Sequence, residues 1–142
     1  MKPRIVMIAA VVAGTSVAAT AQSGTDLVVT VRGVTKPQGG LYVNLCREAE
    51  FLTPKCYKVV GRKVTKTGDY VVMFANVEPG TYAVVALHDV NGNRDLDRNG
   101  YGAPIEPSGV SGKGFAAGQL PQFSRSAFTI GTTPMRVSLD LR

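Results

Sequence analysis

The chain has 142 residues, 44% of them hydrophobic, and carries 16 Lys and Arg against 10 Asp and Glu. This length allows one domain with its own hydrophobic core but not comfortably two. The basic residues are scattered among apolar ones and form no long run. The sequence therefore lacks the clustered positive charge of a nucleic-acid-binding surface.

The N-terminal residues have the organisation of a secretory signal peptide. Lys2 and Arg4 come before an apolar run over residues 5–13, and small residues at 19–21 come directly before Gln22. The run is too short to span a bilayer, which needs about 20 apolar residues. We therefore expect residues 1–21 to be a signal peptide and residues 22–142 to be one periplasmic or secreted domain that does not insert into the membrane.

Several segments of the mature chain have the alternation and β-branched composition of strands. The predicted strands are residues 26–34, 41–46, 57–64, 69–77, 81–87, 127–130 and 135–141, separated by turns that contain Gly, Pro or Thr. Short strands at intervals of about 8–12 residues are typical of a sandwich or small barrel. We predict an all-β fold, a single antiparallel β-sandwich of about seven strands.

The second predicted strand leads into an irregular excursion. Its alternation places Leu41, Val43 and Leu45 on one face and Tyr42, Asn44 and Cys46 on the other. Residues 47–54 follow, with one helical turn expected at 48–51. Because exported proteins retain disulfides and C-x9-C is neither a C-x-x-C redox motif nor a zinc spacing, we expect Cys46 and Cys56 to pair. The alternative is a redox or metal-binding thiol pair.

A long segment with no strand signal covers residues 89–126 and contains repeated Gly and Pro. Loops longer than about 12–15 residues are usually binding loops, lids or disordered, and a disordered segment rarely contains several aromatic residues. The candidate ligand contacts are Tyr101 and Phe115 in the segment and His88 at its start. We expect Phe123 and Phe128 to pack on the core instead.

Oxygen-bearing side chains occupy every second position at the start of this segment. They are Asp89, Asn91, Asn93, Asp95 and Asp97, and Glu106 follows within reach if the loop folds back. Ca²⁺ takes six to eight oxygen ligands, so these six residues are a candidate calcium site. The segment is not an EF-hand, because Arg94 replaces the required Gly and Gly100 the required Glu. An Asx-rich turn without metal explains the same residues equally well, so both accounts stay open.

The combined motifs resemble one family of secreted bacterial proteins. They are Pro79-Gly80-Thr81-Tyr82-Ala83, His88-Asp89-x-Asn91-Gly92-Asn93-x-x-Leu96-Asp97, Gly102-x-Pro104-x-Glu106-x-x-Gly109-x-Ser111 and Pro121-x-Phe123-x-x-Ala127-Phe128. This arrangement resembles Domain of Unknown Function 2141, which often has Gly where this chain has Arg94. The resemblance implies a small exported β-sandwich, similar to transthyretin-like and carboxypeptidase-regulatory-like modules. It implies no established activity, and it suggests that Glu106 belongs to the same site as residues 89–97.

Three functions are compatible with these features. The first is a non-enzymatic binding module for an unknown envelope ligand or protein, with a loop stabilised by Ca²⁺. The second is a structural or adaptor domain of the envelope with a metal-free Asx-rich turn, for which we expect an exposed apolar patch or an unpaired edge strand. The third is a hydrolase using His88 with Asp89 and Ser111. Adjacent residues of a strand point to opposite faces, which argues against this pairing.

Overall fold

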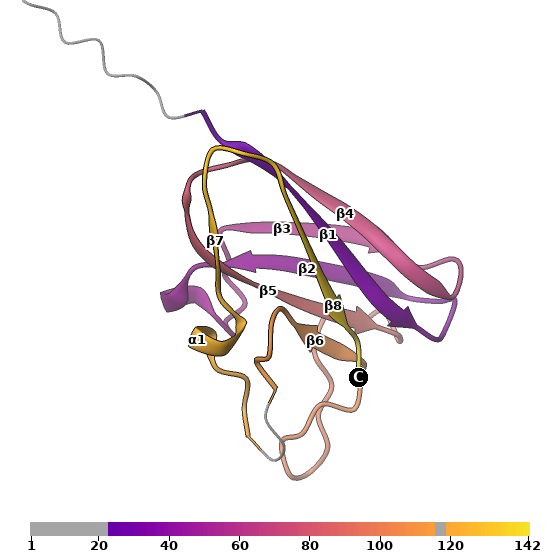
Figure 1. Ribbon diagram of the computed structural model, residues 1–142. Helices are drawn as coiled ribbons and strands as arrows, with labels where there is room; N and C mark the ends of the chain where they lie inside the picture. The colour runs from indigo at the N-terminus through magenta and orange to yellow at the C-terminus, as the bar shows by residue number, and fades with distance from the viewer. Residues whose placement is uncertain (1–22, 116–118) are drawn as a thin grey trace, which may run out of the picture.

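The computed structural model describes residues 23–115 and 119–142, so the expected signal peptide lies outside the described residues. Eight strands form two packed sheets (Figure 1). The strands are β1 Thr25–Val34, β2 Gly40–Cys46, β3 Lys58–Lys63, β4 Gly68–Val77, β5 Gly80–Asp89, β6 Ser108–Val110, β7 Phe128–Ile130 and β8 Met135–Asp140. Two short helices are η1 Glu48–Glu50 and α1 Phe123–Ser126. Neither of them, nor any other described segment, is a helix long and apolar enough to cross a membrane.

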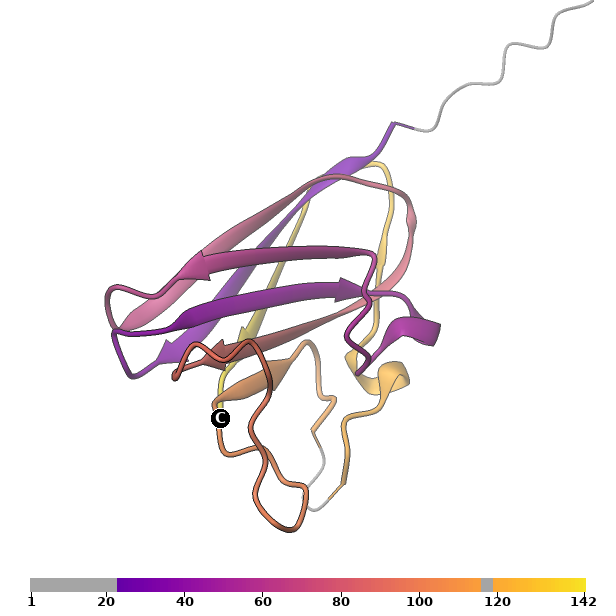
Figure 2. The ribbon, with the colours of Figure 1, turned by 180° about the vertical axis from the view of Figure 1, so that it is seen from behind.

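The two sheets are mostly antiparallel. One has three strands in the order β4-β1-β8, in which β1 pairs antiparallel with β4 and parallel with β8. The other has the order β3-β2-β5-β6, all antiparallel, with β7 paired to the first residues of β5. Figure 2 shows this larger sheet from its own side, with the long loops extending from one end. The predicted all-β, sandwich-like architecture is confirmed, with eight strands in place of about seven and one parallel pairing.

The core lies between the sheets, where the inward residues of alternating strands meet. In β2 the predicted alternation is confirmed, since Leu41, Val43 and Leu45 are fully buried and Tyr42 and Asn44 are only half-buried. Inward residues of β1 and β5 pack against them, and each fully buried Val or Leu contributes about 1.5–3 kcal/mol relative to its exposed state. This burial fixes the register, because a one-residue slip would turn each apolar set toward water.

The predicted disulfide joins Cys46 and Cys56, with 4.5 Å between their Cα atoms. It closes the excursion that follows β2, and η1 lies where one helical turn was expected. The ring of Phe51, just after η1, meets that of Phe123 in α1 edge-on at 5.6 Å between centroids. Phe128 packs against the core as predicted. Phe123 instead contacts Phe51 of the disulfide-closed excursion and is not among the residues packed against the core.

The segment predicted to lack secondary structure contains one strand and one helical turn. The three residues of β6 pair with β5 through Val85–Val110, Ala86–Gly109 and Leu87–Ser108. A Cβ on Gly109 would lie 2.3 Å from the backbone oxygen of Asp140, so the small residue permits β6 to lie close to the end of β8. The strand is too short and too poor in β-branched residues to give an alternation signal. It divides the segment into two loops, residues 90–107 and 111–122.

Candidate functional site

The loop of residues 90–107 begins at a buried carboxylate. Asp89, the last residue of β5, is fully buried. Its Oδ1 accepts a hydrogen bond from the backbone N–H of Gly92 at 2.7 Å, and its Oδ2 accepts one from Arg94 at 2.8 Å. Arg94 has a φ of 65°, in the left-handed region that favours Gly. The carboxylate thus holds the tight turn that a Gly at this position would adopt without strain.

A second buried carboxylate closes the same loop from its other end. Glu106 is 7% exposed, and its two oxygens accept hydrogen bonds from the backbone N–H groups of Val90 at 2.8 Å and Asp97 at 3.3 Å. The backbone N–H of His88 donates to the carbonyl of Pro107 at 2.8 Å. Glu106 therefore returns to residues 89–97, but both of its oxygens face backbone donors.

The remaining polar side chains of the loop bond mainly to one another. The side-chain amides of Asn91 and Asn93 both donate to the carboxylate of Asp97, and their Oδ1 atoms accept from the backbone two residues on, as in Asx turns. Asp95 is exposed and accepts only from the N–H of Leu96. These are the contacts that the metal-free Asx-rich turn predicts.

The six predicted calcium ligands therefore do not converge as one set. Asp89 and Glu106 accept hydrogen bonds from backbone N–H groups. The side chain of Asp95 accepts a hydrogen bond only from the N–H of Leu96 and has none to Asn91, Asn93 or Asp97. Asn91, Asn93 and Asp97 do converge, so these three would hold a cation if the two amides turned their oxygens inward. One carboxylate is a low charge for calcium. Within residues 23–115 and 119–142, no group of three or more His, Cys, Asp or Glu has a metal-binding arrangement.

His88 is a fully buried residue on the inward face of β5. Its Nε2 lies 2.8 Å from the carbonyl oxygen of Gln38, and its Nδ1 has no hydrogen-bond partner among the described residues. The imidazole has no exposed surface in this structure, so the predicted role of His88 as a ligand contact has no support from its position. It helps to hold the turn before β2 against the end of β5.

Ser111 does not face His88. Its hydroxyl accepts from the backbone N–H of Val84 at 2.9 Å and donates to the carbonyl of Ser126 at 2.7 Å. Val84 and His88 are four positions apart on β5, which corresponds to about 13 Å at the usual rise of a strand. The hydroxyl and the imidazole therefore form no nucleophile–base pair.

The two aromatic contact candidates lie in different surroundings. Tyr101 is 98% exposed in a turn held by Asn99, whose Oδ1 accepts from the backbone N–H groups of Tyr101 and Ala103. Phe115 is half-buried, with the guanidinium of Arg142 at 5.7 Å from its ring centroid. The sequence offered no reason to separate them.

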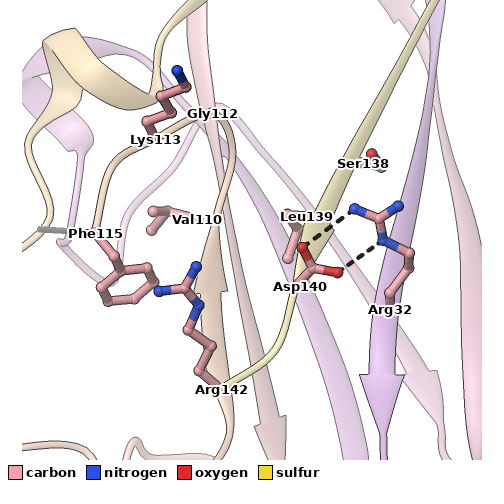
Figure 3. A pocket seen from close by; sticks show the side chains of 9 residues that line it. All are labelled: Arg32, Val110, Gly112, Lys113, Phe115, Ser138, Leu139, Asp140 and Arg142. Atoms are coloured by element: carbon pink, nitrogen blue, oxygen red, sulfur yellow. Dashed lines mark hydrogen bonds and ion pairs between the residues drawn. The ribbon is translucent and has the colours of Figure 1, made fainter.

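Phe115 belongs to a small pocket of about 170 Å³ between the loop after β6 and the end of β8 (Figure 3). The carboxylate of Asp140 at this pocket is already paired with Arg32 at 2.8 Å. Figure 3 shows Arg142 beside the Phe115 ring and Lys113 directed away from the ion pair. The small volume of this pocket leaves room for a ligand of only a few atoms.

A larger groove, of about 490 Å³, is open to solvent beside the other loop, residues 90–107. It lies where β2, β3 and the first residues of the loop meet, and its lining is Gly39, Gly40, Tyr42, Gly61, Arg62, Lys63, Asp89, Gly92 and Arg94. The sequence did not reveal this groove, although the alternation of residues 41–46 placed Tyr42 on the face opposite Leu41, Val43 and Leu45. The available signal was a tyrosine two residues after Gly40 and a predicted strand in which Arg62 and Lys63 follow Gly61.

An exposed apolar surface lies on the opposite sheet. Val71 and Met73 of the edge strand β4 are 62% and 54% exposed. This is the kind of feature that the adaptor hypothesis predicts.

Residues 29–138 match the family model described as "Uncharacterized protein conserved in bacteria (DUF2141)". The chain belongs to this family. No curated protein and no solved structure matches the chain significantly. The resemblance inferred from the motifs is thereby confirmed, and the family's description assigns it no activity.

The matched region of this DUF2141 member contains the whole candidate site. It starts within β1 and ends within β8, so it includes the strands that carry Tyr42 and Gly61 as well as both buried carboxylates of the loop. Groove and loop are thus parts of the family domain itself rather than of a segment added to it.

Proposed function

We propose that this DUF2141 member is an exported, non-enzymatic binding module of the bacterial envelope and that the groove beside Tyr42 is its binding site. The observation that carries the proposal is that basic residues of β3 and of the loop line one groove with the aromatic ring of Tyr42. Arg62, Lys63 and Arg94 line the groove with Tyr42, and none of the three forms an ion pair within the described part of the chain. Charged groups kept unpaired in a concavity are available to a ligand.

The rigidity of the groove supports the same proposal. Two of its walls are paired strands, and the third is a loop whose backbone is tied to the buried carboxylate of Asp89. A site that is already ordered loses little conformational entropy when a ligand binds. The N-terminal signal pattern and the disulfide are consistent with work outside the cytoplasm.

The test uses the full chain expressed in a bacterium and recovered from the periplasm. Mass spectrometry of the recovered protein should place its N-terminus at Gln22. The protein is then sedimented with a washed fraction of cell walls and outer-membrane vesicles from the same cells. We expect the wild type to sediment with this fraction and to be released by added salt, because screening weakens the attraction of exposed charges.

The decisive comparison is between two triple variants of equal charge. One carries R62Q, K63Q and R94Q in the groove, and the control carries K55Q, R125Q and R136Q, which lie outside it. Loss of sedimentation only in the groove variant supports the proposal. Equal behaviour of the two variants overturns it, and loss on V71K instead would favour the adaptor function through β4.

A second candidate is stabilisation of the loop by calcium, which the convergence of Asn91, Asn93 and Asp97 favours. We propose thermal unfolding after chelation, then with CaCl₂ or MgCl₂. An ion at 100 times its dissociation constant stabilises a protein by about 2.7 kcal/mol. A midpoint raised by Ca²⁺ alone, and no longer raised in D97N, would support this candidate. An unchanged wild-type midpoint would exclude it.

A further inference from the structure

We infer that the groove takes an anionic saccharide, with the Tyr42 ring as the surface on which a sugar ring stacks. This inference rests on the proposed function and names its ligand class. The position of the Tyr42 ring and the charge of the residues that line the groove both restrict the chemistry of the ligand.

The Tyr42 ring lies along the sheet because two neighbouring positions have no side chain. A Cβ on Gly40 would lie 3.1 Å from Tyr42 Cε2, and a Cβ on Gly61 would lie 3.3 Å from Tyr42 Cε1. Gly61 is the cross-strand partner of Tyr42, and Gly40 precedes it on the same face of β2. The half-buried ring therefore lies beside these two glycines, and all three residues line the groove.

The charge around this ring is positive. Lys63 is the cross-strand partner of Gly40 and so lies on the same face as Tyr42, and Arg94 lines the groove from the loop. Arg62 also borders the groove, but it is the cross-strand partner of the buried Leu41 and its side chain belongs to the other face of β3. The one acid in the lining, Asp89, is fully buried and accepts two backbone hydrogen bonds, so it offers no free carboxylate to a ligand. An arginine fork binds a carboxylate or phosphate in two places, and a lysine adds a point charge.

A sugar ring fits these constraints better than a nucleobase. The apolar C–H face of a pyranose is about as large as a phenol ring and can stack on a single one, while the sugar's hydroxyl groups stay hydrogen-bonded to water in an open groove. A flipped or single-stranded base is instead usually held between stacking groups and read by hydrogen bonds at its edges. The groove lining contains one aromatic residue and no Asn or Gln. It therefore has the parts to bind a flat apolar face with a negative group beside it.

The experiment is calorimetric titration of the exported protein with four probes. Trigalacturonic acid supplies the sugar and carboxylates, its methyl ester supplies the same sugar without charge, galactose 6-phosphate supplies a phosphate, and inorganic phosphate supplies the anion alone. We expect binding of trigalacturonic acid or galactose 6-phosphate, no detectable binding of the methyl ester, and at least about tenfold weaker binding of inorganic phosphate. Which sugar binds distinguishes a carboxylate-bearing from a phosphate-bearing ligand.

Two tyrosine variants test the stacking surface. Y42A should lower the affinity for the charged sugar by at least about tenfold, as loss of a central aromatic contact commonly does, whereas Y42F should retain it. Y101A is the matched control, because Tyr101 is exposed and outside the groove. Circular dichroism melting of each variant establishes that it is folded.

The outcomes separate this inference from the proposal beneath it. If inorganic phosphate binds as tightly as the sugars, or if Y42A binds them unchanged, the saccharide inference is wrong. If no probe binds while the R62Q/K63Q/R94Q variant still loses sedimentation with the envelope, the inference fails and the proposed function stands. If no probe binds and the R62Q/K63Q/R94Q variant sediments as the wild type does, the saccharide inference and the proposed function both fail.

Discussion

Replacement of Asp89 by Asn should destabilise the loop of residues 90–107 strongly, although it changes one atom. The carboxylate accepts short hydrogen bonds from the N–H groups of Gly92 and Arg94 and is fully buried. In Asn one oxygen remains, and an amide N–H₂ faces the other backbone donor. Hydrogen bonds to charged groups contribute about 1.5–3 kcal/mol each, and an unsatisfied buried donor costs about 1–3 kcal/mol. We therefore expect D89N to lose about 2–3 kcal/mol, or about 10 °C in Tm for a domain of this size.

The matched control for this prediction is D95N. Asp95 lies in the same loop and loses the same charge, but it is exposed and accepts only from the adjacent N–H of Leu96. Thermal unfolding in chelator should show a much smaller shift for D95N than for D89N. Because the loop can open without global unfolding, hydrogen exchange of the peptide containing Gly92 and Arg94 should be measured as well. Equal midpoints and equal exchange for the two variants would refute the role assigned to Asp89.

Two further predictions concern the disulfide and the strained turn. C46S/C56S should lower the free energy of unfolding by roughly 3 kcal/mol on the chain-entropy model, because the bond joins residues 10 apart; a urea titration that shows no change in midpoint would contradict this. R94G should raise Tm slightly, since it removes the cost of a left-handed non-Gly residue, whereas R94V should lower it. The reverse order of these two midpoints would show that Arg94 is not held at positive φ.

Most of the fold could be predicted because alternation and turn residues are local signals. The seven predicted strands all exist, and their ends lie within two residues of the observed ones. β6 could not be predicted, because Ser108-Gly109-Val110 has no intrinsic strand preference and pairs only through contact with β5. The parallel partner of β1 was equally hidden, since strand order depends on contacts between the two ends of the chain.

The candidate site was predictable only in part. The sequence identified the oxygen-rich loop and connected Glu106 with it, and the structure brings those residues together. It could not show that His88 points between the sheets, because this depends on where the strand ends. It also could not assemble the groove, whose members Tyr42, Gly61 and Arg94 come from separate strands and a loop.

The direction of the buried carboxylates explains why the motif and the groove suggest ligands of opposite charge. Alternating oxygens predict a cation as long as their side chains face a common point. In this loop Asp89 and Glu106 turn inward and neutralise backbone N–H groups, which would otherwise be buried without partners. The side chain that the same turn contributes to the groove is Arg94. Because Asp89, the one acid in the groove lining, is occupied inside the loop, the charged side chains that the groove offers to a ligand are cationic, and this is the physical reason to look first for an anion.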